Sequence, residues 1–501
     1  DVDIVIIASK GSRFSIRDNI KALKPDCEYF DIYEELEKEG LKVDYNFFSE
    51  QNIYTELYKT KSNYEQKENN EDDLKKLISL YLKIRDFYYT EKYITEYCEN
   101  QYKDWKFVKE MWKKIQQLIN EVKEKNSGRK GDIIIHLIDS ARAMDVYERS
   151  ADGKVKLSLF KEYEKNAVIF SEAYSTGPST YESMIGTIKQ KYSYDENVYE
   201  NNNFMFDIDE FAFLKRIKKQ NMPIRFYNSK DYYIMNKSDD IYMKEQLHMP
   251  EKLWSAACDM AVTDGPVFNF LYYPWELHFP MLCGYMRRKP QIKMFADVGL
   301  EDMSDFIEDQ LQDCLKYVDC QFAYYKDFFS EDAMTVIMAD HSQPIYDKKR
   351  NDPFFMFYND KDRVAHVTFI IISNELKAGV NSRLFSMLDF NKVMEQAYFE
   401  KCIDIPEREI IEYQFYNVQN RRLRELAMKR GLMDYTEGIR CFVSKKYLYA
   451  KTATGKQEVY DLKDIYSDIS STDEGKNFIK YVEENYDTGF PDFWTVRNTV
   501  S

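Results

Sequence analysis

The segment IIIHLIDSAR (residues 133–142) decides the fold of this chain, and the rest of the sequence can be read outward from it. Its apolar, β-branched run Ile133–Ile138 is typical of a buried strand and ends abruptly at Asp139. The segment TVIMADHS (335–342) has the same form, because an apolar run there stops at Asp340-His341. Ligands bind at the carboxyl ends of strands in open α/β sheets, and Asp and His are metal-ligand types. The two strand ends therefore predict one shared metal site.

Apolar runs and helical patterns alternate along the chain from about residue 130 to residue 372. This alternation predicts an α/β fold in which helices sandwich a mostly parallel sheet. The expected strands are 132–138, 167–170, 224–227, 267–273, 335–339 and 366–372, and the expected helices are 181–192, 209–219 and 301–329. The main domain is therefore expected to span residues 129–400.

Two segments precede the main domain. Residues 1–62 are predicted to form a small, truncated Rossmann-like α/β unit, with a strand over Val2–Ala8 and helices over Ile16–Leu23 and Phe30–Glu39. Residues 63–128 are dense in Glu, Lys, Asn, Tyr and Leu, and they are predicted to form two or three long helices. The chain begins at Asp1 rather than Met, which is compatible with a further N-terminal element before residue 1.

The main domain is followed by a C-terminal subdomain over residues 401–501. Short apolar runs separated by turn residues predict a small antiparallel sheet followed by a helix. The expected strands are 439–443, 446–451 and 458–460, and the expected helix is 474–485.

Composition excludes several classes of partner. The net charge of -15 argues against nucleic acid, because phosphate binding needs a basic face. With only 16 glycines the chain carries neither of the common phosphate-cradling glycine motifs. No segment approaches the ~18 consecutive apolar residues of a membrane span. The eight cysteines are scattered without a Cys-x-x-Cys pair, which predicts reduced thiols and a cytoplasmic protein. The oligomeric state is not indicated.

Two more polar segments adjoin the predicted strands and helices. The loop YSTGPSTYESM (174–184) turns into a helix and offers several hydroxyl groups, and His278 comes just after the strand 267–273. A hydroxyl at a helix N-terminus beside a divalent metal has its alkoxide stabilised by both fields. Two carboxylates, one imidazole and a hydroxyl oxygen would complete a four-ligand metal site.

Each of these residues also has an ordinary structural interpretation. An Asp at a strand end is commonly a helix cap, and a Thr in a Ser/Thr-rich turn commonly closes an ST-turn. A single His is commonly a hydrogen-bonded structural residue, as is expected for His136 inside its strand. His366 precedes the apolar run 367–372 and fits either interpretation. Only the combination of residues, in chain order, favours a functional site.

The combination resembles the sulfatase-like members of the alkaline phosphatase superfamily. IIIHLIDSAR is similar to the opening strand of that family with its Asp-Ser-x-Arg motif, and AYSTGPSTYESM (173–184) resembles its nucleophile loop. YYPWELHFP (272–280) and TVIMADHS are similar to its strand-His-x-Pro and Asp-His-Gly segments. The tail IRCFVSKKYLYAKTATGKQEVYDLKD (439–464) resembles its last strands. The resemblance covers about residues 131–480, and it points to the phosphoglycerol and phosphoethanolamine transferases and the phosphonate monoester hydrolases.

The resemblance implies a role for each matching residue. It makes Asp139, Asp340 and His341 ligands of one divalent metal ion, which could be Mn, Zn, Mg or Ca, with Mn or Zn favoured. It makes Thr180 both the nucleophile and the fourth ligand. It makes His278 the group that meets an oxygen of the substrate or the leaving group.

Other residues are implied as weaker candidates. The candidate substrate contacts are Thr176, Arg142, Lys348, Lys349 and His366. Thr176 is also the runner-up nucleophile, because TGPS (176–179) can be laid over the sulfatase Cys-x-Pro-Ser-Arg motif. The spacing to Ser183-Met184 favours Thr180 as the nucleophile. The two lysines, in a polar run, have surface exposure as their ordinary interpretation.

Two departures from the family pattern bear on the metal. Ser342 stands where the family has Gly, and Ser140 stands where a second Asp would add a carboxylate. These departures favour an alternative in which the fold is retained as a catalytically weak or inactive scaffold. In that alternative the helical N-terminal part serves as a partner surface.

The chemistry of the loop separates phosphate esters from sulfate esters. Sulfatases of this family use a formylglycine made from Cys or Ser within Cys-x-Pro-Ser-Arg. No Cys precedes Pro-Ser-Arg here, and Thr176 cannot be oxidised to an aldehyde because its Cβ carries a methyl group. We therefore expect a metal-dependent phosphoester hydrolase or phosphotransferase acting on a small-molecule or glycan phosphoester, for example in surface-glycan or capsule modification. A sulfatase is the alternative.

Overall fold

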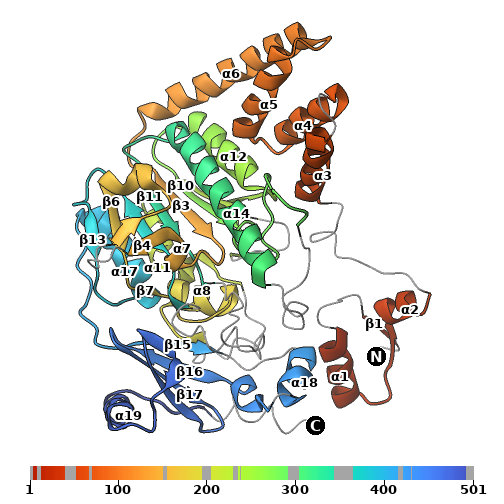
Figure 1. The fold of residues 1–501 in the computed structure, drawn as a ribbon. Helices are drawn as coiled ribbons and strands as arrows, with labels where there is room; N and C mark the ends of the chain where they lie inside the picture. The colour runs from red at the N-terminus through yellow and green to blue at the C-terminus, as the bar shows by residue number, and fades with distance from the viewer. Residues whose placement is uncertain are drawn as a thin grey trace.

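The core of the protein is an eight-stranded sheet, shown in the computed structural model of Figure 1. The structure describes residues 4–7, 13–39, 52–66, 70–149, 155–193, 205–228, 235–236, 238–290, 304–342, 365–415, 421–429 and 431–491. In spatial order the strands are β13 (Gly379–Asn381), β6 (Ala167–Phe170), β12 (Phe369–Ile372), β11 (Met334–Met338), β3 (Ile133–Ile138), β10 (Phe268–Tyr273), β8 (Ile224–Asn228) and β9 (Ile241–Glu245).

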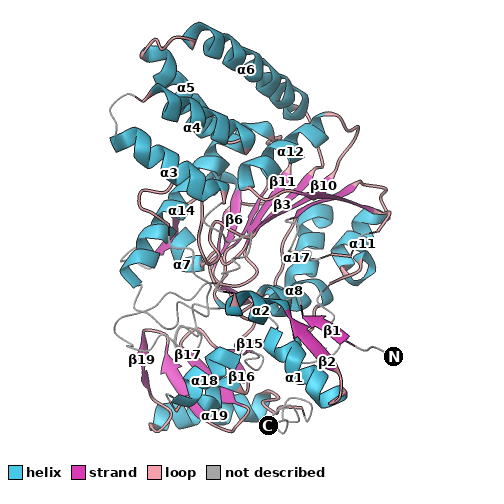
Figure 2. Cartoon of the chain, turned by 90° about the vertical axis from the view of Figure 1, so that its right-hand side faces the viewer, coloured by secondary structure: helices cyan, strands magenta, loops and turns pink. Residues whose placement is uncertain are grey.

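The sheet is mostly parallel. Strand β12 runs antiparallel to β11 and β6, and every other pairing in this sheet is parallel. The central strands β3 and β10 are buried at every position, as expected when helices cover both faces of a sheet. Figure 2 shows α12 (Met249–Ala261) and α14 (Ser304–Tyr325) on one side of the sheet. On the other side lie α8 (Thr180–Lys189), α11 (Ala212–Lys218) and α17 (Phe390–Glu395). The predicted α/β fold class is confirmed.

Strand β12 starts later than predicted. The sequence predicts a strand over 366–372, whereas β12 begins at Phe369. Before it, His366 and Val367 form isolated bridges with Tyr174 and Arg142. The chain pairs there with the segments that follow β6 and β3, so the apolar run is divided between two sets of partners. The edge strands β9 and β13 were not predicted, because their exposed positions weaken the apolar pattern.

The expected helix over Phe30–Glu39 is wrong at its start. Residues Glu28–Asp31 form strand β2, which pairs in parallel with β1 (Ile4–Ile7) and gives that first strand its partner. Helix α2 (Ile32–Lys38) begins only after Asp31, whose Oδ1 accepts hydrogen bonds from the N–H groups of Tyr33 and Glu34. The pairing with β1 overrides the helical spacing, and the Asp side chain then caps the helix.

The long helices before the main domain are α3 (Ile53–Gln66), α4 (Glu71–Lys83), α5 (Phe87–Glu99) and α6 (Trp105–Ser127). Helix α3 runs across residue 62, where the sequence places a domain boundary. Helix α6 packs against α12, so these four helices lie outside the helical layer of the main domain (Figure 1). Among the described residues, no helix combines the length and the apolar character needed to cross a bilayer.

A five-stranded antiparallel sheet forms the C-terminal part. Its strands are, in order, β15 (Ile411–Phe415), β16 (Ile439–Val443), β17 (Tyr447–Thr452), β18 (Gln457–Asp461) and β19 (Asp464–Asp468). The three predicted strands correspond to β16, β17 and β18, and the predicted helix is α19 (Asp473–Asn485). The expected small antiparallel sheet is confirmed, with one further strand at each edge.

The contact between α8 and the preceding loop can be tested at Gly186. A Cβ added there would lie 2.1 Å from Oγ1 of the buried Thr176. Because the packed loop cannot yield freely, we expect Gly186→Ala to lower the free energy of unfolding by about 1–3 kcal/mol, measured by denaturant titration. Gly128→Ala is the control, because nothing lies within 4 Å of its added Cβ. Equal stability of the two variants would contradict this packing.

Candidate metal centre

Three neighbouring parallel strands deliver the candidate residues to one edge of the sheet. Strand β3 lies between β11 and β10, and Leu137 is in register with Met338 and with Tyr272. Asp139 therefore follows the central strand, and Asp340-His341 follows β11 beside it. The segment after β10 carries His278. The parallel register thus explains why residues far apart in sequence meet here.

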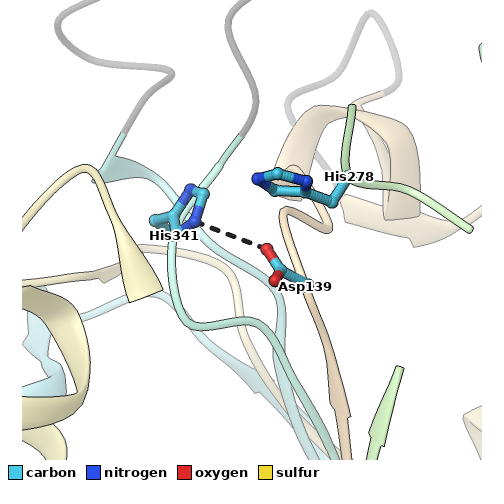
Figure 3. Close-up of side chains that lie close together, drawn as sticks. All are labelled: Asp139, His278 and His341. Carbon is cyan, nitrogen blue, oxygen red and sulfur yellow. Dashed lines mark ion pairs between the residues drawn. The ribbon is translucent and has the colours of Figure 1, made fainter. Parts of the chain in front are cut away.

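Asp139, His278 and His341 converge at this edge (Figure 3). One potential ligand atom from each residue lies within 4.8 Å of the others. Nε2 of His341 is 3.4 Å from Oδ1 of Asp139 and 3.6 Å from Oδ2 of Asp340. The structure therefore brings together three of the four predicted metal ligands, Asp139, Asp340 and His341, and adds His278 to the group of potential ligands.

Backbone contacts fix the tautomers of the two imidazoles. Nδ1 of His341 is 2.9 Å from the carbonyl oxygen of Ser342, and Nδ1 of His278 is 2.9 Å from that of Phe279. Because a carbonyl oxygen only accepts, each Nδ1 carries a proton. In the neutral rings the lone pair then lies on Nε2, which is the arrangement typical of metal-binding histidines.

The two carboxylates are buried side by side. Oδ1 of Asp340 accepts hydrogen bonds from the backbone N–H of Ser140 at 3.2 Å and of His341 at 2.8 Å. Its Oδ2 is buried and has no hydrogen-bond partner. A buried carboxylate oxygen without a hydrogen bond is costly, and a cation between Asp340 and Asp139 would satisfy it. The donor set of carboxylate oxygens and imidazole nitrogens thus fits a divalent metal ion.

The charges of the site shift its pKa values. Burial, followed by the charge of Asp139, raises the pKa of Asp340 above its usual value. Burial by itself would lower the pKa of His341, but Asp340 and Asp139 outweigh it and raise that pKa above the usual 6.5. Two carboxylates that raise the pKa of a neighbouring imidazole indicate a site of excess negative charge. Such a site favours cations.

Thr180 is the hydroxyl of the loop that reaches this group. It is the first residue of α8, and its Oγ1 lies 3.4 Å from Oδ2 of Asp139. Its position at the helix N-terminus places it in the positive end of the helix dipole. Thr176 is instead completely buried, and its Oγ1 lies 3.3 Å from the carbonyl oxygen of Ser183. Of the two candidate nucleophiles, only Thr180 lies beside the carboxylates.

The weaker candidates lie elsewhere or are paired. Arg142 forms a bidentate ion pair with Asp145, with both N–O distances at 2.6 Å. Nε2 of His366 is 2.8 Å from the carbonyl oxygen of Ser171, and its ring stacks on Tyr174. Lys348 and Lys349 lie outside the described residues.

Sequence reasoning missed two residues that hold Asp139. The hydroxyl of Tyr272, the next-to-last residue of β10, donates to Oδ2 of Asp139 at 2.5 Å. Oγ of Ser140 donates to Oδ1 of Asp139 at 3.1 Å. The φ of 64° at Ser140 places this residue in the left-handed region. The pair Tyr272-Tyr273 gave no signal, because only the register of β10 with β3 places one hydroxyl at the site.

Comparison with known proteins bears on the fold. No protein-family model and no curated protein sequence matches the chain. The eight-stranded sheet, its helices and the C-terminal sheet form an alkaline phosphatase-like α/β fold. A protein assigned as a sulfatase from Bacteroides thetaiotaomicron shares it with a TM-score of 0.51 and 14% identity, over 71% of this chain and 91% of its own. The predicted resemblance is confirmed at the level of the fold.

Two further solved structures are similar at lower TM-scores. A phosphonate monoester hydrolase of Agrobacterium radiobacter has a TM-score of 0.49 and 11% identity, over 74% of this chain and 96% of its own. An alkaline phosphatase superfamily protein from Vibrio parahaemolyticus has a TM-score of 0.41 and 13% identity, over 74% and 96%.

Tyr272 provides a test of the metal centre. Tyr272→Phe removes a hydrogen bond that orients Asp139, so we expect the affinity for Mn²⁺ or Zn²⁺ to fall about tenfold in a calorimetric titration. Tyr273→Phe is the matched control, because this equally buried neighbour directs its hydroxyl to Nδ1 of His136, at 2.9 Å. Equal losses of affinity in the two variants would show that Tyr272 has no particular role at the site.

The raised pKa of His341 predicts how metal binding depends on pH. A metal must displace the proton that Asp340 and Asp139 hold on this ring above the usual 6.5. Affinity should therefore weaken as the pH falls, beginning above pH 6.5, by about tenfold per pH unit once the ring is protonated. Calorimetry in buffers of different protonation enthalpy would count the released protons. An affinity that does not change between about pH 5.5 and pH 8 would contradict the assignment.

Proposed function

We propose that this protein is a divalent-metal-dependent phosphoester hydrolase or phosphotransferase that uses Thr180 as its nucleophile. The observation that carries the proposal is the position of Thr180 at the N-terminus of α8, with Oγ1 3.4 Å from Oδ2 of Asp139. A hydroxyl at a helix N-terminus and beside a cation-binding group is suited to ionise and attack.

The residues of the site divide into a metal-holding group and a reacting group. Asp139, Asp340 and His341 would hold the metal ion, with Mn or Zn favoured by the mixture of oxygen and nitrogen donors. When bound, the metal would lower the pKa of the Thr180 hydroxyl and neutralise charge on the transferred group. Tyr272 and Ser140 fix the orientation of Asp139 by their hydrogen bonds.

The reaction follows from this arrangement. Oγ1 of Thr180 gives its proton to water and attacks phosphorus, while the bond from phosphorus to the leaving oxygen breaks on the opposite side. His278 is half-buried and lies beside Asp139 and His341, and its Nδ1 bonds to the backbone. Its Nε2 can therefore stabilise the charge that develops on a substrate or leaving oxygen. Water or an acceptor alcohol then cleaves the phosphothreonine, which gives hydrolysis or transfer respectively.

Phosphate rather than sulfate esters are the proposed substrates. The side-chain hydroxyl at the N-terminus of α8 that donates to Asp139 belongs to a threonine, Thr180. A threonine side chain cannot become the aldehyde on which sulfatases of this family depend, whereas its alkoxide suits phosphoryl transfer. A small-molecule or glycan phosphoester is the proposed substrate class.

Substitution of Thr180 tests the proposal. Thr180→Ala should lower kcat on an aryl phosphodiester at least 1000-fold, or roughly 4 kcal/mol in activation free energy, because no other nucleophile replaces it. Thr187→Ala is the control on the same helix, because its Oγ1 donates to the carbonyl oxygen of Ser183 at 3.1 Å. In assays with added Mn²⁺ or Zn²⁺, the activity of Asp340→Asn should also rise less with added metal than the activity of the wild-type protein.

Three results would contradict the proposal. Full activity of both Thr180→Ala and Asp340→Asn would exclude this site. Sulfate release from aryl sulfates without phosphoesterase activity would favour the sulfatase alternative. A wild-type protein that binds no divalent ion after reconstitution would favour a scaffold with the same fold.

A further inference from the structure

The segment that carries His278 has no regular secondary structure. Residues 274–286 follow β10, and few backbone hydrogen bonds join one part of this segment to another. The N–H of Met281 donates to the carbonyl oxygen of His278 at 2.6 Å, and that of Leu282 donates to Trp275 at 3.2 Å. Yet most of this segment is buried. Its position must therefore depend on the elements packed around it.

Helix α3 reaches this segment through a buried hydrogen bond. The hydroxyl of Tyr54 donates to Oε1 of Glu276 at 3.1 Å, and both residues are completely buried. The N–H of Met249 also donates to this oxygen, at 3.4 Å. Lys252, also completely buried, donates to the carbonyl oxygen of Tyr272 and attracts the Glu276 carboxylate. Glu276 precedes His278 by two residues, so Tyr54 fixes the chain directly before the imidazole.

Helix α4 holds the far end of the same segment. The hydroxyl of Tyr81, a completely buried residue, donates to the carbonyl oxygen of Gly284 at 2.8 Å. On its other side Gly284 meets Tyr317 of α14, since an added Cβ would lie 2.7 Å from that hydroxyl. The Tyr317 hydroxyl in turn donates to Oδ2 of Asp86 at 2.7 Å. Asp86 caps α5 by accepting from the N–H of Tyr89. The segment is thus enclosed between α14 and the helices that precede the main domain.

We propose that α3 and α4 are a structural part of the candidate active site, in which Tyr54 and Tyr81 act as positioning residues for His278. The proposal rests on the proposed function for its consequence at the metal centre, but the contacts themselves are independent of it. It gives the helices of residues 52–127 a role inside the molecule, in place of the partner surface that the sequence left open.

Burial makes these hydroxyls suited to positioning. A hydrogen bond to a buried carboxylate cannot be replaced by water without opening the structure, so its loss leaves the acceptor underpaired. Oε2 of Glu276 already has no hydrogen-bond partner, and removal of the Tyr54 hydroxyl would take one donor away from Oε1 as well. The segment that carries His278 would then open more often, and a displacement of about 1 Å at a reacting group can cost about 100-fold in rate.

The test compares three Tyr→Phe variants of the full chain. Tyr54→Phe and Tyr81→Phe remove the two hydroxyls that reach the segment 274–286. Tyr97→Phe is the matched control, because Tyr97 is also completely buried but donates to Oε1 of Glu71 within the same set of helices, at 2.9 Å. Hydrogen exchange followed by mass spectrometry reads the opening of residues 274–286. Calorimetric titration with Mn²⁺ reads the metal site.

We expect amide exchange in residues 274–286 to become about fivefold faster in Tyr54→Phe and Tyr81→Phe but to stay unchanged in Tyr97→Phe. We also expect both variants to lower kcat on an aryl phosphodiester about tenfold with little change in KM. Mn²⁺ affinity should stay unchanged, because His278 is not among the residues that would hold the metal. A purely structural role would lower thermal stability in all three variants alike and leave kcat of the folded fraction unchanged.

The outcomes separate this inference from the proposed function. Unchanged exchange in both variants, or the same change in Tyr97→Phe, would overturn it. Faster exchange with unaltered kcat would overturn the link to the site. If the wild-type protein binds no Mn²⁺ and lacks activity, the proposed function fails, and the exchange data alone then decide whether α3 and α4 hold the segment.

Discussion

Mutual repulsion between two buried carboxylates is the constraint on which the rest of this site depends. Asp139 and Asp340 end adjacent parallel strands, and the register of β3 with β11 leaves them no way to separate. Hydrogen bonds from Ser140, Tyr272 and the backbone of His341 satisfy several of their oxygens. One oxygen of Asp340 has no hydrogen-bond partner. Two buried carboxylates in this arrangement are stable only beside a positive group. The sheet topology that brings them together therefore favours the binding of a cation between them.

The local sequence was sufficient to predict the central sheet and the residues at its edge. The apolar runs that become β3, β10 and β11 are continuous because these strands are buried on both faces, and such runs are easy to recognise. Asp139, Asp340 and His341 could be predicted because they interrupt these runs. Where partners are shared or exposed, the pattern weakens, as in β9, β13 and the start of β12.

What could not be predicted depends on residues distant in sequence. Nothing near residue 30 shows that Glu28–Asp31 would pair with β1 rather than extend the next helix. The bonds from Tyr272 to Asp139 and from Tyr54 to Glu276 join residues more than 130 positions apart. Among 41 tyrosines, no local pattern distinguishes the few whose hydroxyls reach the site from those that fill the core.

Three buried histidines change the stability of the fold in opposite directions as the pH falls. Burial lowers the pKa of His136 and of His248 to about 3. Below pH 6.5 these two residues are protonated in the unfolded chain but not in the folded one, so the stability of the fold is lost as the pH falls. His341 has a raised pKa, so its proton stabilises the metal-free protein below 6.5 and that contribution is lost as the pH rises. A metal at the carboxylates would supply the same positive charge at neutral pH. A proton on His341 and a divalent metal ion are in this sense alternative counterions for Asp139 and Asp340. The metal-free protein has its counterion in acid, and the metal-bound protein has one near neutral pH.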